Sequence, residues 1–108
     1  GFDIVWINIK EYCRYSDNVY VKYVMFSLNA NKKDIEGFIN KCIDSNVKKI
    51  VISAEWRSIW GYDANWKYGE IGENEINMAR YMREMASSRN LQVEISQIWG
   101  VERIKQIV

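Results

Sequence analysis

The sequence has no histidine among its 108 residues. This absence excludes the commonest general base, the Ser-His-Asp and Cys-His catalytic arrangements, and the side chain that most often binds transition metals. The two cysteines, Cys13 and Cys42, form neither a Cys-x2-Cys pair nor a disulfide framework. Their pattern suits a reducing compartment, so we expect a cytoplasmic protein with inert, buried thiols.

The sequence also lacks a strong charge bias, a long apolar run and a glycine-rich phosphate loop. With 15 basic and 14 acidic residues the net charge is +1, which predicts no strong attraction to nucleic acid or to an anionic membrane. No secretory or transmembrane segment is apparent. The missing phosphate loop argues against nucleotide binding of the Rossmann or Walker kind. We therefore expect no nucleic acid and no membrane among the partners.

The composition that is present predicts one small globular α/β domain over residues 1–108. Hydrophobic residues make up 48% and charged residues 27% of the chain, which is close to the average for soluble proteins. A chain of this length forms a modest core but no large enclosed cavity. Because it begins with Gly1 rather than Met and stops at Val108 without a tail, we interpret it as an excerpt from a longer protein.

Apolar patterns predict alternating helices and strands. Expected helices cover 3–16, with Phe2, Trp6, Ile9 and Cys13 on one face, a segment from Asn31 to Asn46 with Asp34 as a capping partner, 73–89, and a terminal helix marked by Val101, Ile104 and Ile107. Expected strands cover 19–26, 49–53 and 91–95. Consecutive β-α units with right-handed crossovers place three parallel strands side by side. The nearly apolar run at 19–26 predicts a strand covered on both faces.

Residues 54–72 show no regular period and are expected to form a long loop. Aromatic residues alternate there with charged residues and glycines. Such a loop is either a lid that faces a substrate or a cover that packs its rings on the sheet. The sequence leaves both alternatives open.

Functional residues are expected beyond the carboxyl ends of the strands, where parallel α/β proteins bind ligands. The rule selects the segments 27–29, 53–57 and 96–99, which carry hydroxyl, amide and carboxylate groups. Asn29 and Ser53 have an alternative role, in which they cap helices or close turns. Glu55 is suited to orient a ribose hydroxyl or an amine, and its alternative is a surface ion pair with Arg57.

Residues 22–52, KYVMFSLNANKKDIEGFINKCIDSNVKKIVI, resemble a segment of radical S-adenosylmethionine (radical SAM) enzymes. In that family a strand ending in Lys-Tyr and a hydrophobic run precedes Gly-x-Asn-Asp, a helix of the form Ile-Glu-x-Phe-Ile, and a short strand. The matching residues are Lys22, Tyr23, Asn29, Ile35, Glu36, Phe38 and Ile39, whereas Ser27 and Ala30 replace the usual Gly and Asp. The opening GFDIVWINIKEYC is similar to the family helix that precedes this strand.

The resemblance implies a fragment of a partial (β/α)6 TIM-like barrel, the C-terminal half of a larger catalytic domain. The Cys-x3-Cys-x2-Cys motif that binds the four-iron four-sulfur cluster does not occur in the chain, so the cluster belongs to the missing N-terminal part. The positions that this family implies for contact with S-adenosylmethionine are Asn29, Ile52, Ser53 and Glu55, and the expected substrate loop contains Trp56, Arg57, Trp60 and Tyr62. The chain itself supplies no catalytic residue and no metal ligand.

The resemblance further implies that the parent protein cleaves S-adenosylmethionine at the cluster to give a 5′-deoxyadenosyl radical. The 108-residue chain alone is then expected to bind no cofactor, to be inactive, and to need the remainder of the parent chain as its partner. As an excised piece with open strand edges it is also expected to self-associate.

Two other functions are compatible with the residues. The first is a small α/β interaction or ligand-binding module that uses its aromatic loop against a protein or a carbohydrate. The second is a complete small enzyme with Glu55 and Asp63 as acid and base.

Overall fold

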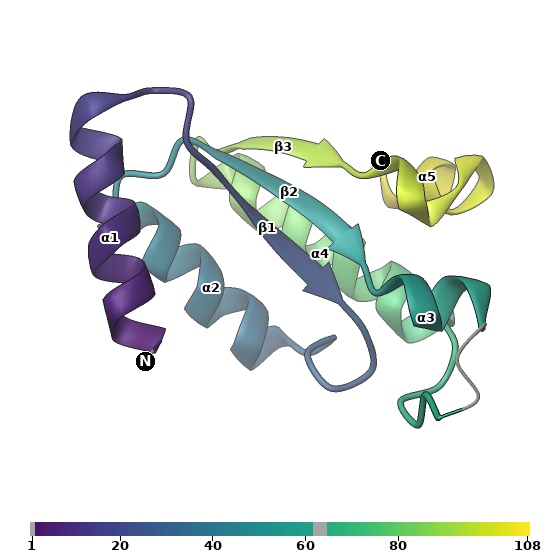
Figure 1. Cartoon of the computed structure of the whole chain (residues 1–108). Helices are drawn as coiled ribbons and strands as arrows, with labels where there is room; N and C mark the ends of the chain where they lie inside the picture. The colour runs from purple at the N-terminus through teal and green to yellow at the C-terminus, as the bar shows by residue number, and fades with distance from the viewer. Residues whose placement is uncertain (1, 62–64) are drawn as a thin grey trace.

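The computed structural model describes the backbone of residues 2–61 and 65–108, and the side chains from residue 4 onward within these ranges. The elements follow the order α1 (Phe2–Tyr15), β1 (Tyr20–Met25), α2 (Lys32–Asp44), β2 (Lys49–Ala54), α3 (Trp56–Trp60), α4 (Glu73–Ser88), β3 (Gln92–Ile95), the 3-10 turn η1 (Gln97–Trp99) and α5 (Val101–Ile107) (Figure 1). The predicted helices and strands are confirmed. The short elements α3 and η1 were not predicted.

The three strands form one parallel sheet in the order β1-β2-β3. Tyr23 of β1 pairs with Ile52 of β2, which in turn pairs with Ile95 of β3. Each strand therefore lies beside the strand that follows it in sequence, as the consecutive β-α units predict.

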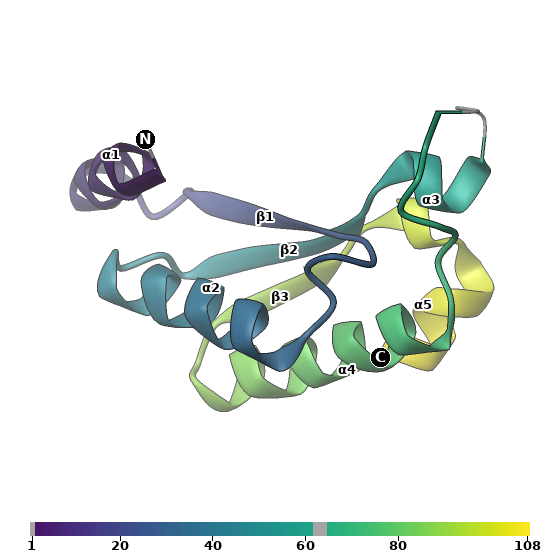
Figure 2. The same ribbon diagram turned by 90° about the horizontal axis from the view of Figure 1, so that it is seen from below.

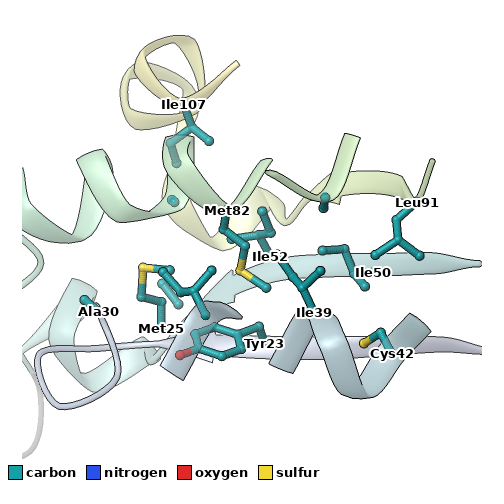
Figure 3. Packing of buried hydrophobic residues seen from close by; sticks show 14 of the residues in the cluster. Tyr23, Met25, Ala30, Ile39, Cys42, Ile50, Ile52, Met82, Leu91 and Ile107 are labelled. Carbon is teal, nitrogen blue, oxygen red and sulfur yellow. The ribbon is translucent and has the colours of Figure 1, made fainter. Parts of the chain in front are cut away.

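Helices α2 and α4 lie on the same face of the sheet, as the view from below shows (Figure 2). The side chains that β1 and β2 direct toward these helices are buried, among them Met25, Ile50 and Ile52 (Figure 3). Ile39 of α2 and Met82 of α4 complete this core with fully buried side chains. Tyr81 of α4 also donates a hydrogen bond to Glu36 of α2 over 2.5 Å, which ties the two helices together.

The opposite face of the sheet has no helix on it within the described residues, so the prediction that the 19–26 strand is covered on both faces is wrong. Tyr20, Lys22 and Val24 of β1 are exposed, whereas Tyr23 and Met25, which alternate with them, are buried. The reason is that side chains alternate between the two faces of a strand. Although the sequence of the edge strand β1 is nearly all apolar, only every second side chain points into the core.

Helix α1 packs against α2 through the predicted face. Trp6 is buried, and its ring meets the Phe38 ring edge-on with 5.8 Å between the ring centres. Phe38 also contacts Tyr23 of β1, with ring centres 4.9 Å apart. The outer face of α1 leaves Ile4 and Tyr15 exposed.

The predicted signals at the two ends of α2 are confirmed. The Asn31 side chain accepts a hydrogen bond from the Asp34 backbone N–H at 2.9 Å and so caps α2. Asn46 and Asn90 follow α2 and α4 with left-handed φ angles of 63° and 65°, which asparagine tolerates better than most residues.

The C-terminal segment is anchored to the central strand. Trp99 of η1 is fully buried, and its indole N–H donates to the Ile52 carbonyl of β2 at 3.1 Å. Arg80 and Arg83 of α4 donate to backbone carbonyls of α5 at 2.8 Å each. No helix in the described ranges is long and apolar enough to cross a membrane.

Replacing Ile39 by alanine is expected to lower the free energy of unfolding by about 2–5 kcal/mol, because it leaves a cavity between α2 and the sheet. The milder Ile39→Val is expected to cost about 0.5–1.5 kcal/mol. Urea denaturation followed by circular dichroism measures both changes. Ile7→Ala on the exposed face of α1 is the control, and an equal loss there would contradict the assignment of the core.

Candidate functional site

The carboxyl ends of β1 and β2 lie side by side, next to α3 (Figure 1). Val24 pairs with Ser53, and the Glu55 N–H donates to the Met25 carbonyl at 2.9 Å, so the pairing continues one residue past β2. The structure thus brings Ser53 and Glu55 next to the end of β1, where the turn with Asn29 begins. Ser96 follows β3, and its N–H donates to the Ile52 carbonyl at 3.0 Å.

Asn29 uses its side-chain amide to close the turn after β1. Its carbonyl oxygen accepts from the Phe26 N–H at 2.9 Å, and its NH2 group donates to the Val24 carbonyl at 2.8 Å. Its own backbone carbonyl accepts from the Tyr23 hydroxyl at 2.6 Å. These contacts match the turn-closing alternative, and the contact of Asn29 with a cofactor stays a prediction.

Ile52 and Ser53 lie on opposite faces of β2 because successive side chains of a strand alternate. Ile52 is fully buried in the core, and its carbonyl already accepts from Ser96 and Trp99. The Ser53 side chain belongs to the face that no described helix covers, although the residue itself is only 5% exposed. Of these two predicted contacts, Ser53 is therefore the one suited to reach a ligand on the open face.

Glu55 forms an ion pair with Arg57, with 3.0 Å between the Arg57 Nε and a carboxylate oxygen. The hydrogen bond from Arg57 lowers the pKa of the Glu55 carboxyl group, and it outweighs burial, which acts to raise this pKa. The Arg57 guanidinium lies over the Trp66 ring, 4.1 Å from its centre. The ion-pair alternative is confirmed, and it leaves Glu55 anionic at neutral pH.

The second half of the predicted loop folds over the end of β1. Trp66 and Tyr68 both contact the Phe26 ring, with centres 5.7 Å and 5.4 Å apart. The Trp66 indole N–H donates to the Ser58 hydroxyl at 2.9 Å, and the Ser27 hydroxyl donates to the Tyr68 carbonyl at 2.6 Å. Trp66 and Tyr68 therefore act as a cover rather than as a free lid.

The first half of that loop is ordered differently from the prediction. Residues 56–60 form α3, and Trp56 and Trp60 on it are 46% and 57% exposed. Tyr62, like Asp63, lies outside the described residues. Of the predicted substrate loop, the structure thus places Trp56, Arg57 and Trp60 next to the carboxyl end of β2.

A groove of about 630 Å³ lies between β1 and α2, and sequence reasoning did not find it. We call it the β1–α2 groove. Its lining includes Lys22, Val24, Asn29, Lys33, Phe38 and Lys41. A signal was present in the lysines at 33 and 41 and in the glycine at 37, which lie on the helix beside β1, but only the structure shows that β1 is an edge strand.

The described side chains provide no cluster of metal ligands. Across the side chains of 4–61 and 65–108, no group of three or more histidine, cysteine, aspartate or glutamate residues is arranged to hold a metal ion. Cys13 and Cys42 are free thiols on α1 and α2. Burial, reinforced by Cys13, raises the pKa of Cys42 to about 12, so this residue stays protonated and inert.

No protein-family model, curated protein or solved structure matches the chain.

Asn29→Ala is expected to lower the free energy of unfolding by about 1–3 kcal/mol, because the Phe26 N–H and the Val24 carbonyl lose their partner. Leu28→Ala in the same turn is the control, since Leu28 is exposed and contributes little. Thermal and urea unfolding measure both variants. Equal stability of Asn29→Ala and the unmodified chain would contradict the turn-closing role.

The Glu55–Arg57 pair is expected to make stability depend on acidity. The pKa of Glu55 is lower in the folded chain than in the unfolded chain. The pair therefore stabilises the fold fully at pH values above the ordinary glutamate pKa of about 4.3, and this stabilisation is lost as the pH falls through the folded-state pKa. Unfolding midpoints from pH 7 to about pH 3 should therefore fall less steeply for Glu55→Gln than for the unmodified chain. Parallel curves would show that the pair contributes nothing.

Proposed function

We propose that the chain forms consecutive β/α units in the wall of a partial (β/α)6 barrel of the radical SAM type, as the C-terminal half of its catalytic domain. The observation that carries this proposal is the one-sided arrangement of the sheet. Parallel strands follow one another in sequence order, and α2 and α4 cover only one face (Figure 2). A barrel wall has this arrangement, since helices surround it on the outside and side chains fill the inside.

The chemistry of the uncovered face supports the same proposal. By the register of the sheet, Lys22, Ser53 and Glu94 belong to that face, one from each strand. Val51 lies between them and is 4% exposed. This face also carries Val24 beside Ser53, and such a mixture of polar and apolar side chains suits the interior of a barrel that holds a polar ligand better than it suits a surface meant for water alone.

In the proposed protein, the end of β2 contributes to the S-adenosylmethionine pocket. Glu55 accepts hydrogen bonds from a ribose hydroxyl or an amine, and Arg57 keeps its carboxylate charged and oriented. Ser53 adds a hydroxyl on the inner face, and Asn29 fixes the neighbouring turn. Trp56, Arg57, Trp60 and Tyr62 supply the substrate contacts.

Such a protein would hold an iron-sulfur cluster, which would supply one electron for the reductive cleavage of S-adenosylmethionine. The ligands of this cluster come from the remainder of the larger protein. Cys13 and Cys42 do not fit this role, since Cys42 is buried at the far end of α2 from the strand ends (Figure 3).

A second candidate is an interaction module without catalysis. It is favoured by the exposed side chains of Trp56 and Trp60 on α3, which offer aromatic surface to a protein or a carbohydrate. This candidate requires no iron and no S-adenosylmethionine.

The deciding experiment uses the full protein that contains this chain, purified without oxygen. Iron and sulfide analysis should give about four irons per chain. The electron paramagnetic resonance spectrum of the reduced protein should change when S-adenosylmethionine is added. A protein without iron after reconstitution would overturn the proposal and leave the interaction module.

In that protein, Glu55→Gln is expected to raise the Kd for S-adenosylmethionine by roughly 10-fold to 100-fold, because a charge-assisted hydrogen bond is worth about 1.5–3 kcal/mol. Isothermal titration calorimetry measures the change. Glu102→Gln on the exposed side of α5 is the matched control. Unchanged affinity in Glu55→Gln would exclude Glu55 from the pocket.

A further inference from the structure

Strand β1 pairs with β2 along one edge and has no described strand along the other. The Met25 carbonyl accepts from the N–H of Glu55, the residue that follows β2, so Met25 directs its backbone groups toward β2. The backbone N–H and C=O groups of successive residues in a strand point toward opposite edges. The N–H and C=O groups of Tyr20, Lys22 and Val24 therefore point toward the outer edge. A row of hydrogen-bonding groups thus stands ready to pair with another strand.

Asn29 limits the length of this outer edge. Its amide accepts from the Phe26 N–H and donates to the Val24 carbonyl, which are edge groups at the end of β1. The amide occupies the place that the peptide group of a neighbouring strand would take. Pairing along the outer edge is therefore confined to residues 20–24.

The β1–α2 groove runs along this edge and is basic. Lys22, Lys33 and Lys41 are exposed and line it, and none of the three forms a salt bridge with another described residue. Asp34 also lines the groove, but its carboxylate accepts from the Asn31 side chain at 2.9 Å. The groove carries more positive than negative charge, which favours an acidic occupant.

Gly37 makes room for this occupant. It lies within α2, where glycine costs about 0.5–1 kcal/mol relative to alanine. Apart from its two chain neighbours and the nearby backbone of α2 itself, no atom lies within 4 Å of the position that a Cβ would take, so the packing of the chain does not require glycine. Its bare backbone leaves the groove open beside Phe38.

We infer that the β1–α2 groove binds an extended acidic segment, which pairs as an added strand with residues 20–24. The inference rests on the proposed function for its source, which is the remainder of the larger protein. The segment's alternate side chains point to α2, where Lys33, Phe38 and Lys41 line the groove, on one side and to Lys22 on the other. A second copy of the chain is disfavoured, because it would bring the same lysines to the edge.

A synthetic peptide tests the chemistry of the groove on the 108-residue chain. The probe is a blocked peptide of about eight alternating valine and glutamate residues, titrated at low salt and followed by amide chemical shifts. Shifts are expected at residues 20–24, 33, 37 and 41, and they should weaken at higher salt. Shifts elsewhere, or none, would overturn the inference.

Two further peptides separate charge from strand pairing. A valine and lysine peptide should not bind, and equal binding would show that charge plays no part. An acidic peptide with N-methyl groups on alternate residues keeps its side chains but loses its edge hydrogen bonds. It should bind at least 10-fold more weakly, and equal binding would exclude an added strand.

Protein variants locate the site. Lys33→Glu should weaken binding of the acidic peptide about 10-fold, whereas Lys105→Glu on α5 should leave it unchanged. Gly37→Ala should stabilise the free chain by about 0.5–1 kcal/mol, and Gly37→Leu should block the peptide. A dimer in light scattering, together with amide shifts at residues 20–24 that depend on protein concentration, would replace the inferred segment by a second copy.

The outcome is separable from that of the proposed function. If the acidic peptide binds but the full protein contains no iron, the inference about the β1–α2 groove is supported and the radical SAM function is excluded. Iron with a spectral response to S-adenosylmethionine, but no peptide binding, keeps the role and rejects the groove.

Discussion

The central strand β2 supports most of the other elements, because it is paired on both edges and its residues from Ile50 to Ala54 have little exposed surface. The backbone groups of its successive residues form hydrogen bonds alternately with β1 and β3, so β2 fixes the register of the whole sheet. The Ile52 carbonyl illustrates this density, since it accepts hydrogen bonds from both Ser96 and Trp99. The terminal segment is thereby joined to the middle of the sheet, although more than forty positions separate it in sequence.

Charge and aromatic packing then organise the strand ends. Arg57 bonds to Glu55 and lies over Trp66, so one guanidinium connects the end of β2 with the returning loop. That loop covers Phe26 at the end of β1. Because partly buried ion pairs need well-defined geometry, this arrangement holds Glu55 in one orientation rather than leaving it mobile in water. A fixed carboxylate is better suited to recognise a ligand than a freely rotating one.

Local patterns predicted the elements well. The spacing of Ile35, Ile39 and Cys42 identified α2, and those side chains are fully buried. Tertiary contacts decided what the patterns left open. The apolar run of β1 predicts a strand covered on both faces, whereas only one of its faces is buried, and the aromatic residues of α3 show no helical period that would predict it.

The candidate site was predictable in place but only partly in role. The strand-end rule selected Asn29, Ser53 and Glu55, and the structure brings the latter two next to the end of β1. The sequence could not show that the Asn29 side-chain amide forms hydrogen bonds with the backbone of Val24 and Phe26, because the hydrogen bonds of a turn depend on its backbone path. Several residues that carry the family resemblance also have packing roles, as Phe38 does between Trp6 and Tyr23.

The one-edged pairing of β1 has a consequence for its amide protons. Protons that point toward β2, at Val21, Tyr23 and Met25, are held in the sheet and exchange with solvent slowly. Those of Tyr20, Lys22 and Val24 point outward and exchange fast, whereas the Phe26 proton is shielded by Asn29. The exchange rates along this short strand therefore alternate from one residue to the next. Measured in solution, this alternation shows which edge of β1 is open.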